Sequence, residues 1–291
     1  MHNNMLQRLI KHVATILLTA VLGGMLGATL VRFAPGSGID EREFDPRLSA
    51  ESVAALRQQL RTENNLPNFY RHYFAGLLHG DLGFSRTLNR PAAQLIATRF
   101  PVTLRQVSIG LLVGWTIAML LVIPAVMLHS WQFNLLAGGL TSTLLAVPAA
   151  VLALMFVFFR APPSLALALV VVPKIFGYSR NVMLRSYELP HVLAARCKGL
   201  SEVRVFFWHV LPVTAPQMLA LVAISVTLAI GAAIPVEALC DLPGIGQLAW
   251  QAALGRDLVL LVNLTTLVTL ITVTINSASD LLGRSMWRGT A

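Results

Sequence analysis

The chain has 291 residues, of which 56% are hydrophobic and only 12% are charged, and its formal net charge is +9. An ordinary soluble domain has about 25% charged residues, so this composition excludes a disordered chain and argues against a soluble enzyme. Charged residues are absent from 106–159, 205–236 and 258–279. Since a helix needs about 20 predominantly apolar residues to cross a bilayer, the sequence predicts an all-α polytopic membrane protein.

The first predicted element is a membrane span over residues 13–31, which follows a short basic segment. A signal peptide is the alternative, but the apolar stretch is long for one, and Gly23, Gly24 and Gly27 recur in it as they do in packed membrane helices. Residues 34–103 form a polar region with eight Arg against seven Asp and Glu. Long segments translocate regardless of their arginines, so we expect this region outside, with helices at 49–64, 67–79 and 91–100.

Spans two and three are expected at about 104–128 and 132–159, and a sharp outer turn at 160–163 leads to span four. That span, from Ser164 to about Arg180, is the least secure because Pro173 and Lys174 interrupt it. Residues 174–204 carry a net charge of +4, and cytoplasmic loops collect Lys and Arg. Only with span four do these residues lie in the cytoplasm, so the charge favours six spans. The same preference of inner loops for Lys and Arg accounts for the basic excess better than nucleic-acid binding does.

Span five is expected at about 208–236, an outer loop with a net charge of −2 at 237–257, and span six at about 258–281. With six spans, both termini lie in the cytoplasm. We expect two domains: residues 1–103, an N-terminal span plus an external amphipathic region, and residues 104–285, a five-span transmembrane domain that includes the inner loop 186–204. Cys197 and Cys240 fall on opposite sides of the membrane, so no disulfide is expected.

The inner loop carries a predicted short helix from Glu188 to Lys198, with Gly199 placed as its C-cap. Ser201 is placed to cap a second helix that enters the bilayer. The small residues of the short helix are compatible with the close approach of a partner. An ordinary connecting helix that packs on the lipid headgroups is the alternative.

The loop residues resemble a family motif. Ala194-Ala195, Gly199 and Leu211-Pro212 keep the spacing of the cytoplasmic loop motif of permease subunits of binding-protein-dependent ABC importers, although Leu193 and His209 stand where that motif has Glu and Ile. The segment 195–201 is similar to the dipeptide/oligopeptide/nickel branch. Further pieces that resemble this branch cover nearly the whole chain: 80–85, 90–91, 100–104, Glu237 with 243–246, 256–257 and the end around Asp280.

The resemblance implies an ABC importer permease-like fold with a cytoplasmic coupling helix, in the bacterial inner membrane. It implies a subunit that translocates peptides or a related small solute, including nickel, together with a paralogous second permease, two cytoplasmic ATPases and an external solute-binding protein. The residues implied to contact the ATPase are Ala194, Ala195, Arg196, Lys198, Gly199 and Leu200. The chain has no phosphate-binding loop of the Walker type, so we expect its partners, and not this chain, to hydrolyse ATP. We expect no catalytic residues, no cofactor and no metal site in it.

Candidate residues for the translocation path lie in spans four and six. Thr265, Thr269, Thr272 and Asn276 share one helix face, which fits either a polar path or interhelical packing. Lys174 lies at membrane depth, where an ionisable residue is a functional candidate, unless it snorkels to the inner headgroups.

The outer loop is a candidate gate. Its residues are Glu237, Asp241, Pro243, Gly244 and Gly246, and the two acids would favour a cationic ligand unless they only form a solvated loop. The family has a longer connection between spans three and four than residues 160–163. A structural subunit that has lost transport is therefore an alternative function, whereas an intramembrane hydrolase would need acidic or basic pairs that spans two, three, five and six lack.

Overall fold

The structure, a computed structural model, describes residues 14–15, 18–19, 21–27, 29, 71, 73, 75–77, 79–128 and 131–288. The helix expected at 49–64 lies outside the described residues, as do parts of the first expected span and of the helix expected at 67–79. The chain divides into two compact units, residues 1–99 with 248–270 and residues 100–247 with 271–291. Each unit is described by itself.

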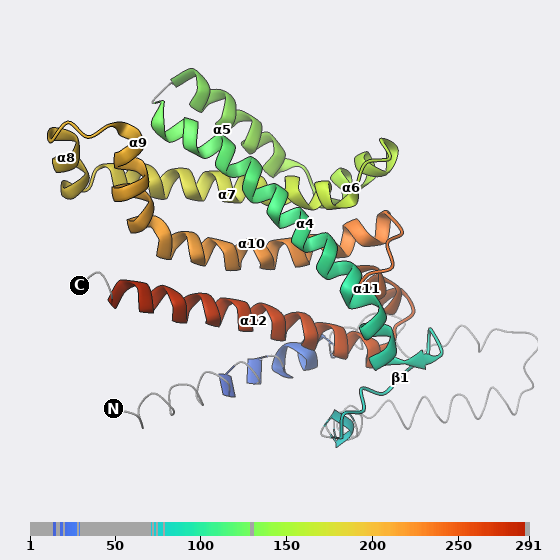
Figure 1. Ribbon diagram of the computed structural model, residues 1–291. Helices are drawn as coiled ribbons and strands as arrows, with labels where there is room; N and C mark the ends of the chain where they lie inside the picture. The colour runs from blue at the N-terminus through green and yellow to red at the C-terminus, as the bar shows by residue number, and fades with distance from the viewer. Residues whose placement is uncertain are drawn as a thin grey trace, which may run out of the picture. The chain divides into compact units, whose positions relative to one another are not determined.

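The described elements are helices apart from one hairpin (Figure 1). Strands β1 (Phe84–Ser85) and β2 (Arg90–Pro91) pair antiparallel, with Phe84 opposite Pro91, and lead directly into α4. The helices are α4 (Ala92–Met127), α5 (Trp131–Ala146), α6 (Ala149–Phe158), α7 (Pro163–Tyr187), α8 (Pro190–Cys197), α9 (Glu202–Val205), the π-helical turn η2 (Phe206–Val210), α10 (Leu211–Leu239), α11 (Ile245–Leu254) and α12 (Leu258–Arg288).

Four described helices are long and apolar enough to cross a membrane: Ala92–Met127, Pro163–Tyr187, Glu202–Leu239 and Leu258–Gly283. They correspond to the predicted spans two, four, five and six. The helix expected for the doubtful fourth span is present, and Pro173 lies inside α7 without ending it. Membrane helices tolerate proline because neighbouring groups can satisfy the backbone atoms that it leaves unpaired. The total of six spans stays a prediction.

The predicted third span is not one continuous helix. Helix α5 ends at Ala146, α6 begins at Ala149, and the two are bent by 96°. Pro148 occupies the N-cap position of α6 with φ −61° and ψ 145°. Since a proline has no N–H and its ring clashes with the preceding turn, the apolar run breaks there. Hydropathy alone, from which span three was predicted at about 132–159, does not register the break at one proline.

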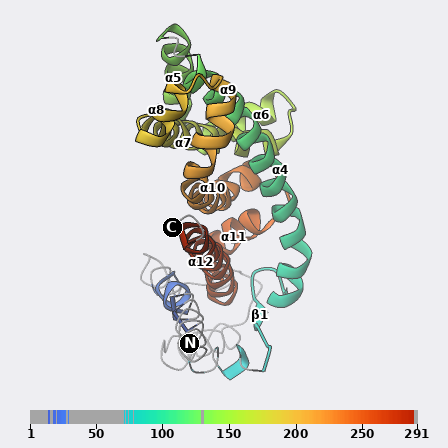
Figure 2. The same ribbon diagram turned by 60° about the vertical axis from the view of Figure 1, so that its left-hand side comes forward.

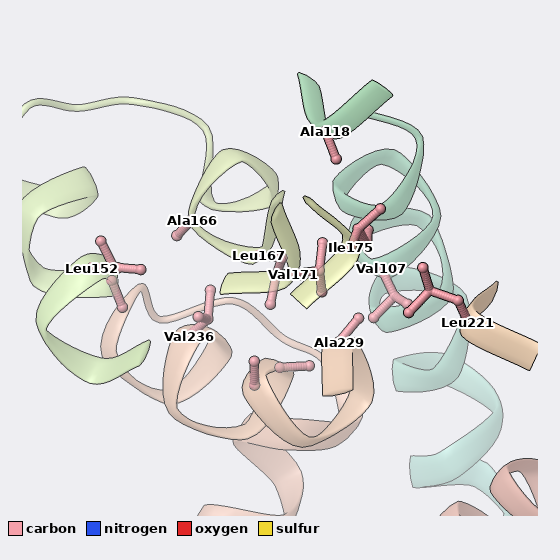
Figure 3. Close-up of a cluster of buried hydrophobic side chains, with 13 residues drawn as sticks. Val107, Ala118, Leu152, Ala166, Leu167, Val171, Ile175, Leu221, Ala229 and Val236 are labelled. Atoms are coloured by element: carbon pink, nitrogen blue, oxygen red, sulfur yellow. The ribbon is translucent and has the colours of Figure 1, made fainter. Parts of the chain in front are cut away.

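Helix α7 is the central element of the unit of residues 100–247 with 271–291, where it packs against α5, α6 and α10. Figure 3 shows the core between these helices, formed by aliphatic side chains from α4, α6, α7 and α10. Two glycines of α4 let it approach α7 closely. A Cβ on Gly110 would lie 2.8 Å from the Cβ of Leu167, and one on Gly114 would lie 2.5 Å from the Cγ2 of Val171. Small residues at such crossings are typical of membrane helices.

In the other unit, residues 1–99 with 248–270, a buried carboxylate joins the hairpin to α12. Asp257 is 5% exposed and accepts hydrogen bonds from the Ser85 hydroxyl at 2.6 Å and from the Leu260 N–H at 3.0 Å. The Asn263 amide donates to the Leu82 carbonyl at 2.8 Å. Two segments that resembled the family separately in the sequence, 80–85 and 256–257, are therefore neighbours in the fold.

Candidate functional site

The short helix predicted between spans four and five is α8. It gathers with α9 and η2 at one end of α7 (Figures 1 and 2). Gly199 follows it with φ +76°, the left-handed conformation of a C-terminal helix cap, as predicted. Ser201 occupies the predicted N-cap position of α9, and its side chain makes no capping hydrogen bond there.

Helix α8 has a buried face and an exposed face. Val192 and Ala195 are buried in a cluster with Phe176, Met183 and Val205. The exposed face carries Leu193, Ala194, Cys197, Lys198 and Gly199. Of the residues predicted to contact a partner, Ala194, Lys198 and Gly199 are thus accessible, Arg196 and Leu200 are half-buried, and Ala195 packs within its own chain.

Arg196 connects α8 to the helices on either side. Its Nη2 donates to the Glu202 carboxylate of α9 at 2.8 Å, and its guanidinium carbon lies 4.8 Å from the ring centre of Tyr187, the last residue of α7. Both partners of the ion pair are partly exposed, so the pair contributes up to about 1 kcal/mol. The side chain that sequence reasoning assigned to a partner contact holds three elements of this chain together.

The π-helical turn η2 was missed by sequence reasoning. It lies between α9 and α10 within one long helix, Glu202–Leu239. Pro212 and Pro216 have no N–H to donate to the carbonyls four residues earlier. These two prolines, four residues apart, were the feature of the sequence that could have indicated an irregular helix here. Because π turns occur mostly as single bulges at functional positions, η2 marks the joint between the α8 segment and the span that follows.

The predicted outer gate centres on a buried acid. Glu237 is 0% exposed, and its Oε2 accepts a hydrogen bond from the Gly246 N–H at 2.6 Å. The Thr103 hydroxyl accepts from the Ile245 N–H at 2.7 Å. The first two N–H groups of α11, which no helical carbonyl can pair, are thus satisfied by side chains of α10 and α4. The solvated alternative does not hold for Glu237, whereas Asp241 is exposed and accepts from the Gln247 amide at 2.6 Å.

Both glycines of this turn are required by space. A Cβ on Gly246 would lie 2.7 Å from the Ala233 carbonyl oxygen, and a Cβ on Gly244 would collide with the Glu237 carboxylate. Pro243, the remaining predicted gate residue, is exposed. The sequence 243–246 is therefore shaped to pass closely over the end of α10.

The threonine face of α12 is covered in part by the glycines of the first expected span, within the unit of residues 1–99 with 248–270. A Cβ on Gly23 would lie 3.1 Å from the Thr269 hydroxyl, and one on Gly27 would lie 3.2 Å from the Thr265 methyl. Both threonines donate their hydroxyls to carbonyls four residues earlier in α12, at 2.8 and 2.7 Å. These contacts favour the packing alternative for Thr265 and Thr269. Thr272 and Asn276 are half-buried in the other unit.

Polar links between spans were also missed. Arg180 on α7 donates to the side-chain oxygen of Asn134 on α5 at 2.8 Å, and the Asn134 amide donates to the Ala125 carbonyl of α4 at 3.1 Å. Trp115 on α4 donates to the Ser225 hydroxyl of α10 at 3.1 Å. The signal available in the sequence was their polarity inside stretches that are otherwise apolar.

Comparison with known proteins gives three findings. A profile of the family described as "Binding-protein-dependent transport system inner membrane component" matches residues 106–288. A Brucella suis protein named as a peptide transport system permease is 25% identical over 307 residues, covering 94% of this chain and 95% of that protein. The nickel import system permease protein NikB of Staphylococcus aureus is 25% identical over 297 residues, covering 96% of this chain and 89% of that protein.

One solved structure has a similar fold. It is a chain of the MetNI methionine ABC transporter in an inward-facing conformation, which is 16% identical with a TM-score of 0.60. The match covers 66% of this chain and 96% of that chain. At this identity the likeness concerns the fold alone.

Proposed function

Because this chain belongs to the family of inner membrane components of binding-protein-dependent transport systems, we propose that its cargo is a peptide or a related small solute, with nickel as the alternative. The chain is a multi-pass permease component of an ABC importer and not its catalytic subunit. The cargo proposal is supported by relatives named for peptide and for nickel transport that align over nearly their whole length.

The proposed partners are two cytoplasmic ATPases, a second and paralogous permease, and an external solute-binding protein. The ATPase docks on the exposed face of α8, where Ala194, Lys198 and Gly199 are accessible. Small side chains there let another protein approach the backbone closely. The other three predicted contact residues, Ala195, Arg196 and Leu200, support this face from within the chain. Arg196 joins α8 to Tyr187 and Glu202, so a displacement of α8 is transmitted to α7.

The outer turn is the proposed external gate. The hydrogen bonds that Glu237 and Thr103 accept from the start of α11 support a unit in which α10, α4 and α11 move together. With α8 on the cytoplasmic side and this turn outside, closure of the ATPases would change both ends of the path.

Reconstitution tests the proposed function. The chain is co-expressed with a paralogous permease, two ATPases and a solute-binding protein from the same organism, and the purified complex is placed in proteoliposomes. We expect the ATPases to co-purify, and the loaded binding protein to stimulate ATP hydrolysis and the uptake of labelled dipeptide. A complex that assembles but transports neither dipeptide nor nickel would instead identify a structural subunit.

A further inference from the structure

Helix α7 differs from the other membrane helices in what it leaves exposed. Its four exposed residues are Lys174, Tyr178, Asn181 and Arg185. Their spacings of four, three and four place them on one face of the helix. We call these four residues the polar face of α7.

The polar face is unsuited to lipid. Helices α4, α5 and α6 expose many large hydrophobic side chains, which are Leu, Ile, Val, Met, Phe and Trp, whereas the only exposed large hydrophobic residue of α7 is Tyr178, at 41%. Polar and ionisable residues within membrane spans face a protein interior or a water-filled cavity. Among the described residues, none forms a hydrogen bond or ion pair with the Lys174 or Arg185 side chain. The polar face is therefore not expected to face lipid.

Lys174 lies near the middle of α7. It is the twelfth of the 25 residues of α7, so about 16 Å of helix separate it from one end and about 20 Å from the other. A lysine side chain extends roughly 6 Å. Its ammonium group therefore does not reach either end of the helix.

Helix α7 itself carries no acid. No Asp or Glu occurs between Asp81 and Glu188. Glu188 follows the helix at its end, three residues beyond Arg185, and no ion pair joins their two side chains. The hydroxyl of Tyr178 and the amide of Asn181 add hydrogen-bonding groups between the two cations. Such a row is complementary to a carboxylate.

We propose that the polar face of α7 lines the translocation path, and that Lys174 and Arg185 bind the carboxylate of the solute in transit. This inference rests on the proposed function and deepens it. Solutes that carry a carboxylate, such as acidic or zwitterionic peptides, then pass preferentially, and the passage of cationic peptides or of a bare divalent cation is opposed.

Thiol reactivity tests the charge of this face without relying on any cargo. Tyr178→Cys is introduced into a chain with Cys197→Ser and Cys240→Ser, and the assembled complex is treated with methanethiosulfonates that carry a sulfonate or a trimethylammonium group. Each reaction rate is divided by the rate of the same reagent with a free thiol. We expect this normalised rate to be higher for the sulfonate reagent than for the trimethylammonium reagent. Adding Lys174→Met should lower the sulfonate preference about tenfold, equivalent to roughly 1.4 kcal/mol.

The matched control is Arg105→Met, which removes an exposed cation from α4 instead of α7 and should leave the preference unchanged. Asn181→Cys replaces Tyr178→Cys if the latter does not fold. Absence of reaction at both positions would mean that lipid or a partner subunit covers the face, and would overturn the inference. A preference for the ammonium reagent, or one that Lys174→Met does not alter, would overturn it as well.

Uptake measures the consequence for transport. In proteoliposomes, Lys174→Met should lower the ratio of Glu-Glu to Lys-Lys uptake about tenfold, and Arg105→Met should not. An unchanged ratio with active transport contradicts the inference. If the wild-type complex transports neither dipeptide, the proposed peptide cargo fails, and the thiol rates alone decide the inference.

Discussion

Gly199 combines a left-handed backbone with empty surroundings. Its φ is +76°, and a Cβ built on it would meet no atom within 4 Å. A side chain at this position would therefore be disfavoured by the left-handed backbone conformation and not by steric contact with other atoms. The angle at which the chain leaves α8 depends on this one residue.

Gly199→Val should lower the uptake of solute per ATP hydrolysed, because a β-branched residue in the left-handed region costs about 1–2 kcal/mol and would shift the end of α8. Gly199→Asn is the matched control, since asparagine tolerates this conformation. Both are measured in the reconstituted complex. Full coupling in the valine variant would refute the proposed role of α8.

The two cysteines differ in environment and provide their own control. Cys197 is exposed, whereas Cys240 is partly buried at the end of α10, and burial raises the pKa of the Cys240 thiol. Only the thiolate is nucleophilic, so at neutral pH Cys240 should be alkylated by iodoacetamide more slowly than Cys197. The Cys240 rate should still be rising at a pH where an ordinary thiol levels off. Equal pH profiles, measured by mass spectrometry of the alkylated peptides, would contradict this expectation.

At the scale of the element, two adjacent alanines of α8 lie on different faces. Ala195 lies on the face that packs within the chain, and Ala194 lies on the proposed docking face. Ala194→Trp adds bulk on the exposed side, so it should abolish co-purification of the ATPase while changing stability within about 0.5 kcal/mol. Ala195→Trp is the same substitution on the buried side, and overpacking there should lower the free energy of unfolding by about 1–3 kcal/mol. The measurements are the yield of co-purified ATPase and thermal unfolding in detergent. Retention of the ATPase by Ala194→Trp would place docking elsewhere.

Helix α11 depends on side chains of other elements for its start. Glu237→Gln should reduce stability by about 1–3 kcal/mol, because the amide keeps one oxygen to accept the Gly246 N–H and brings two N–H donors into a buried site. Asp241→Asn, at an exposed position of the same turn, should change stability by no more than about 0.5 kcal/mol. Thermal unfolding compares the two variants. Equal effects would show that burial of the Glu237 carboxylate contributes nothing.

At the scale of the whole molecule, the orientation in the membrane depends on α7. Alkaline phosphatase, which is active only outside the cytoplasm, should be active when fused after Arg160 and inactive when fused after Gly199. The physical reason is the net charge of +4 over residues 174–204, which favours the cytoplasm. Fusions of green fluorescent protein at the same sites should give the opposite pattern. An active phosphatase after Gly199 would remove α7 from the spans.

Prediction from the sequence was strongest where one physical preference acts over many residues. The long apolar helices were located because each has about 20 uncharged positions, and Gly199 was located because few residues fit its backbone. Prediction failed where a single residue, or a contact with a residue distant in sequence, determines the local structure. Pro148 breaks α5 from α6, and the buried state of Glu237 depends on an N–H nine residues ahead.

The sequence by itself determined that this protein is a helical membrane protein of the importer permease family, because hydropathy, charge asymmetry and the residues around Gly199 are properties of the chain. Tertiary structure decided the roles of individual polar residues. Arg196 stacks on Tyr187 within its own chain, and Thr265 and Thr269 pack against glycines. On α7, four polar side chains remain on one exposed face. Burial and partnership arise from neighbours distant in sequence, and only the folded chain specifies them.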